Sequence, residues 1–285
     1  MSKISIILPT YNVEKYIARA LDSCINQTYK DIEIIVVDDL GDDKSIDIAK
    51  EYASKDERIK IIHNDKNLGT FASRNIGVLN SNSPYIMFLD PDDYLDLKAC
   101  ELVLKSIKNN NILQFNMKIK NIDDSNHCIA KNFKDFKKNI KNLEFMPWNL
   151  CTLLVKKEFY LERVKFHRRR ILFAEDMLVF ISLINSKMFF LDIPLYYYDQ
   201  NKNSITKSTN KEKYKIQLKD QIFILKQIEK SNLDKDIIAY YRFFLKRNIL
   251  FCLYKLQKIS FLKYKLIKKQ YKISAFFYKI LGKYI

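Results

Sequence analysis

Glycine, proline and cysteine are scarce in this sequence, which has only 4 Gly, 5 Pro and 5 Cys among 285 residues. No GxxxxGKS or GxxxxGKT loop occurs, which argues against phosphoryl transfer from ATP. The cysteines are scattered without a CxxC pair, so neither a disulfide framework nor a zinc knuckle is expected, and most should be small buried side chains in a reducing compartment. The histidines are isolated and show no ligand spacing such as HExxH, so we assign no metal to His63, His127 or His167.

Long apolar stretches are absent as well. No stretch reaches the roughly 18 uninterrupted apolar residues of a membrane-spanning helix. The run over residues 4–8 stops at Pro9, too early for a signal peptide. Hydrophobic residues nevertheless make up 48% of the chain, enough for a sizeable core. We therefore expect a folded cytoplasmic protein with one large domain and a smaller appendage.

Acidic residues are outnumbered by lysine and arginine, 33 to 50, which gives a formal net charge of +17. Much of the excess lies in residues 241–285, which contain 12 Lys or Arg, no Asp or Glu, and many large apolar side chains. This composition predicts a segment that lies on the anionic inner face of the cytoplasmic membrane, where each Lys adds about 1 kcal/mol. The structural alternative is a helical layer that packs on the rest of the chain and points its lysines outward.

Strand and helix patterns alternate over the first hundred residues. Residues 4–8, 32–37, 59–62 and 85–89 are short, mainly apolar runs typical of buried strands. Such alternation predicts a parallel sheet with right-handed crossovers, in which ligands bind beyond the carboxyl ends of the strands. The first intervening helix is predicted to follow an N-cap at Asn12 and to place Ile17, Leu21, Cys24 and Ile25 on one face, and the next two are predicted at 45–52 and 70–79.

Regular patterns are sparser after residue 100. We expect a helix over residues 97–109, a strand over 112–119, then an exposed loop, and a helix over 175–185. Beyond residue 207 the pattern is helical to the end of the sequence.

Three carboxylates follow the fourth predicted strand, in Asp90-Pro91-Asp92-Asp93. They repel one another unless a cation or hydrogen-bond donors compensate. Carboxylate oxygens suit Mg²⁺ or Mn²⁺, which typically keep waters and bridge to substrate phosphates. The cluster therefore predicts a hard-cation site that neutralises the charge growing on a leaving diphosphate. The alternative is a helix N-cap with solvated neighbours.

Two further acidic pairs are candidate site residues. Asp38-Asp39 ends the second predicted strand, where a carboxylate can accept the imide N–H of a uracil or the hydroxyls of a ribose; aspartate at such a place is also common turn chemistry. Glu175-Asp176 opens a predicted helix beside an apolar run, a setting in which a carboxylate can act as general base on an attacking hydroxyl. Acids in a first helical turn are also favoured by the helix dipole alone.

Short stretches that surround these acids form a recognisable set. They are Ile6–Asn12, Gln27–Tyr29, Glu33–Asp39, Asn67–Gly69, Ser73–Gly77, Phe88–Asp93, Trp148–Leu150 and Ala174–Asp176. Together and in this order they resemble the family 2 glycosyltransferases, which have the GT-A fold. The resemblance is dense over the first hundred residues, thins to scattered anchors up to residue 206 and does not cover the tail. Within the family, the chain looks most like the Campylobacter-type lipooligosaccharide β-1,3-galactosyltransferases.

This resemblance implies a fold and a domain organisation. The fold is α/β, Rossmann-like, with a mostly parallel sheet flanked by helices. The catalytic domain would cover residues 1–206, with a nucleotide-sugar-binding half at 1–100 and an acceptor and catalytic-base half at 101–206. A basic helical region would follow at 207–285.

The resemblance also implies roles on the donor side. Pro9, Thr10, Tyr11 and Asp39 would hold the uracil and ribose of a UDP-sugar. Arg74 would approach the nucleotide or its diphosphate.

On the catalytic side, Asp92 and Asp90 would hold Mn²⁺ or Mg²⁺, and Asp90 would also contact the ribose or sugar. Asp176, with Glu175 next to it, would be the base for in-line attack on the anomeric carbon, with inversion of configuration. Trp148 would offer an aromatic face to an acceptor sugar, although a core position suits such a ring equally well.

The function implied is transfer of a hexose to a lipid-linked oligosaccharide, a precursor of a lipooligosaccharide or cell-surface polysaccharide. Galactose from UDP-galactose is the first choice, with N-acetylgalactosamine and glucose as alternatives. A nucleotidyltransferase also uses paired aspartates and a metal, but it would release pyrophosphate. The alternative from another class is a protein that binds nucleic acid or membrane through its basic tail. No nucleic-acid partner is predicted, because clustered carboxylates repel phosphate.

Overall fold

The computed structural model describes residues 3–120, 126–129, 149–167, 169–183, 186–199 and 210–270. The chain forms two compact units. The first unit contains Met1–Asn132, Asn149–Ile171 and Ser182–Asn201. The second contains Phe133–Trp148, Leu172–Ile181 and Lys202–Ile285. The segment Leu172–Ile181, which contains the predicted base Asp176, therefore belongs to the same unit as the C-terminal helices.

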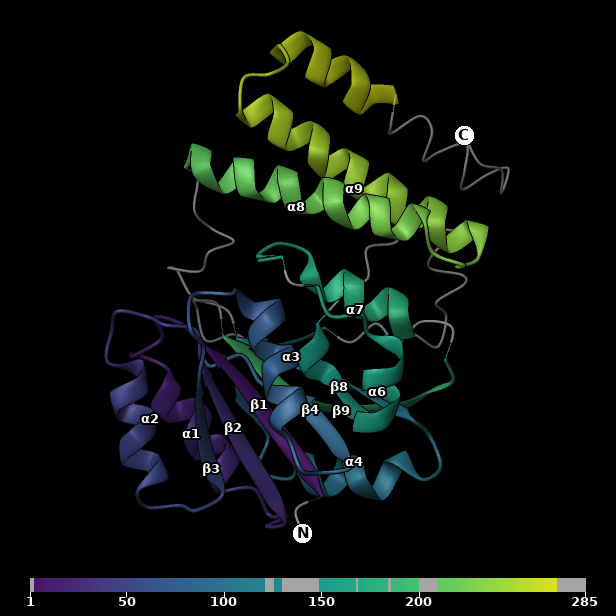
Figure 1. Ribbon diagram of the computed structural model, residues 1–285. Coiled ribbons are helices and arrows are strands. Elements are labelled where there is room, and N and C mark those ends of the chain that lie inside the picture. Colours follow the sequence, from purple (N-terminus) through teal and green to yellow (C-terminus); the bar gives the residue numbers. More distant parts are fainter. Residues whose placement is uncertain are drawn as a thin grey trace. The chain divides into compact units, whose positions relative to one another are not determined.

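A nine-stranded sheet forms the centre of the first unit, in the order β3-β2-β1-β4-β8-β6-β9-β5, with β7 paired to β6 (Figure 1). The first four strands are parallel to one another. They are β1 (Ile4–Thr10), β2 (Ile32–Asp38), β3 (Ile59–His63) and β4 (Tyr85–Phe88).

The second half of the chain adds strands of both directions to this sheet. β8 is antiparallel to β4 and β6, whereas β9 is parallel to β6 and antiparallel to β5. These strands are β5 (Tyr94–Leu95), β6 (Ile112–Lys120), β7 (Asn126–Ile129), β8 (Leu153–Lys156) and β9 (Met188–Asp199). The predicted α/β fold is confirmed, and the complete sheet is mixed because β8 enters it antiparallel between β4 and β6.

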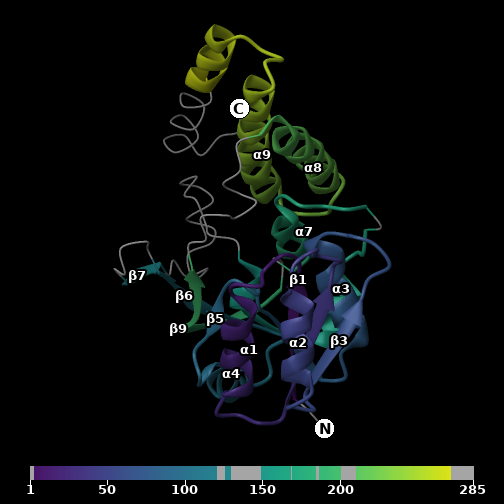
Figure 2. The same cartoon turned by 90° about the vertical axis from the view of Figure 1, so that its left-hand side faces the viewer.

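Helices cover both faces of this sheet, with α3 on one side and α1 and α4 on the other (Figure 2). Ile17, Leu21 and Cys24 of α1, at helical spacing, are buried, and α4 is tied to the end of α1 through the Cys100 amide, which donates to Gln27 Oε1 at 2.9 Å. The helices of the first unit are α1 (Ile17–Ile25), α2 (Ser45–Ala53), α3 (Thr70–Asn80), α4 (Ala99–Ile107) and α6 (Lys157–Arg163); a 3-10 turn, η2 (Leu150–Thr152), precedes β8.

The core lies along β1 and β2, in which every residue is buried. Each large aliphatic side chain buried there contributes about 1.5–3 kcal/mol relative to an exposed one. Proline has no backbone N–H to donate to a neighbouring strand. Pro9 is tolerated in this central strand because β4 pairs with β1 only over Ile4–Ile7, so no residue of β4 loses a hydrogen bond.

The second unit is helical. α8 (Lys211–Glu229) and α9 (Lys235–Lys255) lie side by side and bury Ile224, Ile228 and Tyr241, and a further helix covers residues 261–270 (Figure 1). α7 (Glu175–Leu183) begins in this unit, and its last residues group with the first. Within the described residues, no helix is both long enough and apolar enough to span a bilayer.

Within the described residues, the helices and strands predicted from the sequence are present, and most ends are shifted by at most two residues. The predicted cap of the first helix is wrong: α1 begins at Ile17 after Tyr16, because Asn12 has a left-handed backbone (φ 51°) in the loop after β1. The buried state predicted for most cysteines is confirmed for Cys24, Cys100, Cys151 and Cys252. β9 was not predicted, although it is a twelve-residue strand that pairs with both β6 and β5. The exposed loop predicted after residue 119 and the last fifteen residues, 271–285, lie mostly or wholly outside the described residues.

Candidate functional site

The candidate site lies at the carboxyl ends of the parallel strands. The strand order reverses at β1, which has β2 on one side and β4 on the other, and such a switch point opens a crevice for ligands. The loops after β1, β2 and β3 each contain a residue with left-handed backbone: Asn12 (φ 51°), Leu40 (φ 56°) and Gly69 (φ 84°). Strain of this kind in non-glycine residues costs about 1–3 kcal/mol and is typical of functional loops.

The end of β1 presents one exposed side chain. Pro9 and Thr10 are buried, and the Thr10 hydroxyl donates to the Leu8 carbonyl at 3.1 Å. Tyr11 follows with 41% of its surface exposed. Of the three residues predicted at this strand end, only Tyr11 therefore offers a broad side-chain surface to a ligand.

Asp39, at the end of β2, anchors the loop that follows β3. Its carboxylate is 3% exposed and accepts hydrogen bonds from Asn64 Nδ2 at 2.8 Å and from the amides of Leu68 and Gly69 at 2.7 and 2.8 Å. Since a carboxylate has about four acceptor positions, these donors leave roughly one for a ligand. In the neighbouring Asp38, the carboxylate oxygen Oδ2 lies 2.7 Å from His63 Nδ1. Asn64 was not predicted as part of this site.

Arg74 and Asp90, which the sequence singles out separately, form an ion pair in the structure. Arg74 lies on α3 and is almost fully buried, and its Nη2 donates to Asp90 Oδ1 at 2.7 Å, while Asp90 keeps 29% of its side chain exposed. The guanidinium also lies over the ring of Phe88, 5.8 Å from its centroid. Asp90 is therefore held in place by a buried cation and still faces solvent.

Asp93 points into the protein. It is 1% exposed and accepts two hydrogen bonds, one from the hydroxyl of Tyr196 and one from the amide of Asp199 at 2.7 Å. Burial raises the pKa of Asp93 well above its ordinary value, and the negative charges of Asp92 and Asp90 raise it further. Both donors come from β9, which the sequence analysis missed. The run Leu-Tyr-Tyr-Tyr-Asp (195–199) was the available signal, because clustered aromatics before an acid are unusual in an exposed strand.

Asp92 and Asp90 are the carboxylates of this cluster that remain partly exposed. Their negative charges add to burial in raising the pKa of Asp93. In the part of the chain that the structure describes, no three His, Cys, Asp or Glu side chains are grouped so that they could hold a metal alone. Two carboxylates nevertheless suit Mg²⁺ or Mn²⁺, which takes its other ligands from water and substrate phosphates. The donor set fits such an ion.

Glu175 and Asp176 lie in the first turn of α7, both half-buried, directly after Ala174, whose backbone is left-handed at φ 60°. They belong to the second unit, whereas the carboxylates after β4 belong to the first. Their role as base stays a prediction. Trp148, predicted to contact the acceptor, lies outside the described residues.

Comparison of the sequence with known protein families identifies the family of this chain. The sequence profile of glycosyl transferase family 2 matches residues 5–155, which contain β1 to β4, Asp39, Arg74 and the acidic cluster. The chain belongs to glycosyl transferase family 2.

Curated relatives of this family 2 chain match part of it. An uncharacterized glycosyltransferase of Haemophilus influenzae is 41% identical over 113 residues, which are 40% of this chain and 45% of that protein. The uncharacterized glycosyltransferase EpsJ of Bacillus subtilis is 31% identical over 217 residues, which are 71% of this chain and 62% of the relative. The chain thus spans less than two thirds of either relative.

Solved structures share the fold of this family 2 chain. TarS of S. aureus (residues 1–349, in complex with UDP-GlcNAc) superposes with a TM-score of 0.66 at 21% identity, covering 86% of this chain and 72% of TarS. The mannosyltransferase PcManGT of Pyrobaculum calidifontis, in complex with GDP-Man and Mn²⁺, superposes with a TM-score of 0.58 at 12% identity, covering 94% of this chain and 79% of PcManGT.

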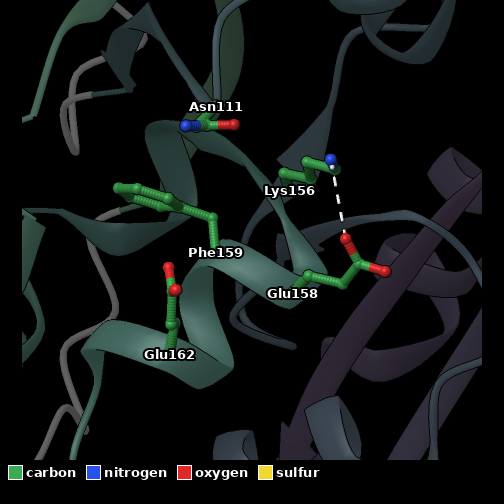
Figure 3. Close-up of a pocket in the computed structure, with 5 residues that line it drawn as sticks. All are labelled: Asn111, Lys156, Glu158, Phe159 and Glu162. Atoms are coloured by element: carbon green, nitrogen blue, oxygen red, sulfur yellow. Dashed lines mark ion pairs between the residues drawn. The ribbon is translucent and has the colours of Figure 1, made fainter.

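A pocket of ≈ 340 Å³ lies near the amino ends of the parallel strands, where β8 ends and α6 begins. Figure 3 shows its lining, in which Lys156 pairs with Glu158 at 3.6 Å and Phe159 supplies the apolar wall. Because β8 is antiparallel to β4, its end lies at the amino edge of the parallel strands, away from the carboxyl ends that carry the site. The pocket is therefore separate from the candidate site.

Proposed function

We propose that this chain is an inverting, metal-dependent glycosyltransferase that transfers a hexose from a UDP-sugar to the glycan of a lipid-linked oligosaccharide. The observation that carries the proposal is the arrangement after β4. Asp90 is braced by the buried Arg74, Asp93 is turned inward, and Asp92 stays partly exposed at the crevice of the sheet. Such an arrangement suits an anionic leaving group whose charge must be offset.

The donor nucleotide is proposed to bind at the ends of β1 and β2. Tyr11 offers an exposed ring, and Asp39 keeps about one acceptor position beside the buried Pro9 and Thr10. Aromatic rings and carboxylates suit the face and the imide or hydroxyl donors of a uridine. The TarS complex, which has the same fold, contains UDP-GlcNAc, and this supports a UDP-sugar as donor.

Asp92 and Asp90 would hold Mn²⁺ or Mg²⁺, and the ion, when bound, would supply positive charge for the leaving diphosphate. Arg74 holds Asp90 in place through its hydrogen bond of 2.7 Å. The buried guanidinium adds a fixed positive charge to the same end of the site. The PcManGT complex, which contains Mn²⁺, supports this choice of ion.

Asp176 is proposed as the base that takes the proton from the attacking acceptor hydroxyl, with Glu175 next to it. Both carboxylates lie at the start of α7, and the strained backbone of Ala174 directs the chain into this helix. Because inversion needs in-line attack opposite the leaving group, one carboxylate base is sufficient. Trp148 is proposed to stack against an acceptor sugar ring.

Galactose is the proposed sugar, with N-acetylgalactosamine and glucose as alternatives, on the resemblance to Campylobacter-type lipooligosaccharide galactosyltransferases. The acceptor would then be the growing glycan of a lipooligosaccharide or cell-surface polysaccharide. Selection of one sugar epimer depends on few pocket contacts, so the donor must be identified by assay.

The test incubates the full chain with UDP-galactose, UDP-N-acetylgalactosamine and UDP-glucose, with Mn²⁺ or Mg²⁺ and with or without EDTA, and measures UDP release. We expect one donor to be consumed only with metal. Asp92→Ala should abolish turnover and weaken UDP binding, whereas Asp176→Ala should lose turnover by about 10²–10⁴-fold and still bind UDP. Asp47→Ala is the matched control, because Asp47 is a 75% exposed aspartate on α2.

Two outcomes contradict the proposal. Release of pyrophosphate in place of UDP would identify a nucleotidyltransferase. Binding of none of the UDP-sugars, even with lipooligosaccharide acceptor present, would remove the nucleotide-sugar function altogether.

Residues 241–285 are proposed to bind the anionic inner face of the cytoplasmic membrane, which would bring the enzyme to a lipid-linked acceptor. In the second unit, Tyr264 stacks on Tyr254 with ring centroids 4.6 Å apart, so this side of helix 261–270 packs on α9. Leu262 and Leu266, one turn apart, are 71% and 59% exposed. Exposed leucines among lysines suit an anionic lipid surface.

Vesicle sedimentation tests this membrane proposal. The full chain should bind vesicles that contain phosphatidylglycerol and not vesicles of phosphatidylcholine alone, and high salt should release it. Leu262→Asp/Leu266→Asp should reduce binding, whereas Leu97→Asp, at a 52% exposed leucine of the first unit, should not. Equal binding by the tail variant and the control would favour a tail that only packs on its own unit. A salt-sensitive shift of DNA or RNA would instead favour a nucleic-acid partner.

A further inference from the structure

Arg19, on α1, is tied to the main chain of the acidic loop. Its Nη2 donates to the Asp92 carbonyl at 2.6 Å, and its Nη1 pairs with the carboxylate of Asp199 at the end of β9. Its guanidinium lies over the ring of Tyr94, 4.7 Å from the centroid. Tyr94 is in turn stacked on Tyr197, with ring centroids 4.7 Å apart and planes 4° from parallel.

These contacts close a ring around the acidic loop. Arg19 holds Asp92 through its carbonyl, and Asp92 is joined by a peptide bond to Asp93. Asp93 accepts the Asp199 amide, and the side chain of Asp199 returns to Arg19. The ring connects α1, the loop after β4 and β9, three segments that are far apart in the sequence. The loop therefore cannot shift without breaking a charge-assisted hydrogen bond.

A guanidinium is required for this arrangement. Its N–H donors form a planar fork that can serve a carbonyl and a carboxylate at the same time, while its face rests on an aromatic ring. A lysine ammonium keeps the charge but is a single point on a flexible stem, so it cannot reproduce the bridge.

We propose that Arg19 is a positioning residue that fixes the main chain of Asp92 and thereby aims its carboxylate at the metal and diphosphate, an inference that rests on the proposed function. Arg19 acts through Asp92 and not on the substrate. Its effect should therefore appear in metal affinity, because residues that orient a ligand typically change metal affinity by about 10–100-fold when they are replaced.

The test compares the full chain with Arg19→Lys and Arg19→Ala. Arg58→Lys is the matched control, because Arg58 likewise bridges a carboxylate, Asp56, and a main-chain carbonyl, Ile25, but at the amino edge of the sheet. Two quantities are measured: the Mn²⁺ concentration that gives half-maximal UDP release, and Mn²⁺ binding to the UDP-loaded protein, followed through the electron paramagnetic resonance signal of free Mn²⁺. Urea unfolding of each variant reports stability separately.

We expect Arg19→Lys to raise the half-maximal Mn²⁺ concentration and to weaken Mn²⁺ binding by roughly tenfold, with kcat at saturating Mn²⁺ changed much less. Arg58→Lys should lose comparable stability and keep wild-type Mn²⁺ binding. Equal Mn²⁺ binding by wild type and both Arg19 variants would overturn the positioning role while the proposed function stands. Absence of Mn²⁺ binding to the UDP-loaded wild type would overturn the metal-dependent function and this inference with it.

Discussion

At Gly77, α3 packs tightly against Ile7 of β1, and a single added methyl group tests that packing. A Cβ built at this position would lie 2.3 Å from Ile7 Cγ2, 3.3 Å from Ile7 Cγ1 and 3.2 Å from Val37 Cγ2. Carbon atoms in ordinary contact are about 3.5–4.0 Å apart. Gly77→Ala therefore forces α3 away from the sheet by roughly 1 Å or pushes Ile7 out of its rotamer.

Two opposing terms decide the size of the effect. Alanine in a helix interior is favoured over glycine by about 1 kcal/mol. Overpacking a well-filled core costs about 1–3 kcal/mol, and Ile7 and Val37 belong to fully buried strands that have little room to move. We expect Gly77→Ala to lower the free energy of unfolding by roughly 1–2 kcal/mol.

Urea unfolding followed by far-ultraviolet circular dichroism measures this change. Leu79→Ala is the control on the same helix, since Leu79 is 55% exposed and should change stability by less than about 0.5 kcal/mol. In the background of Ile7→Ala, which removes both Ile7 atoms that the added Cβ would meet, including the one at 2.3 Å, Gly77→Ala should become neutral or stabilising. A stabilised Gly77→Ala, or an equal loss in both backgrounds, would refute the close-packing argument.

Two further predictions concern buried ionisable groups. Burial alone would raise the pKa of Glu33, but hydrogen bonds from Ser5, the Asn82 amide and Lys60 outweigh it and lower the pKa below its ordinary 4.5. Glu33→Gln should therefore cost about 2–3 kcal/mol at pH 7 by urea unfolding, and the difference from wild type should shrink as pH falls below 4.5; a difference that grows toward low pH would show the sign to be wrong. Burial raises the pKa of Cys24 to about 12, so iodoacetamide at pH 8 should label it only after unfolding, by peptide mass spectrometry, and rapid labelling of the native chain would contradict its burial.

Much of the first unit follows from local sequence. Residues 4–8 and 32–37 are apolar enough to be buried on both faces, and the helices between strands carry apolar residues at a spacing that only a helix places on one side. Alternation of these segments leaves a parallel sheet as the consistent arrangement, which also places Asp39 and the acidic cluster at the same, carboxyl ends of the parallel strands.

The later strands were less predictable, because their pairing is a long-range property. β8 is only four residues long, and nothing in its sequence indicates that it enters antiparallel between β4 and β6. β9 contains a proline and alternates poorly, yet it pairs with both β6 and β5. Short strands gain most of their stability from such neighbours, so their place in a sheet cannot be deduced from their own residues.

The sequence by itself determined that three carboxylates gather after β4 and that a cation or hydrogen-bond donors must compensate them. Only the tertiary structure decided which carboxylate does what. Asp93 turns inward because Tyr196 and the Asp199 amide, more than a hundred residues later, supply donors in a buried place. Asp90 stays at the surface because Arg74 reaches it from α3. Charge repulsion depends on residues adjacent in sequence, whereas its relief depends on residues that only folding brings near.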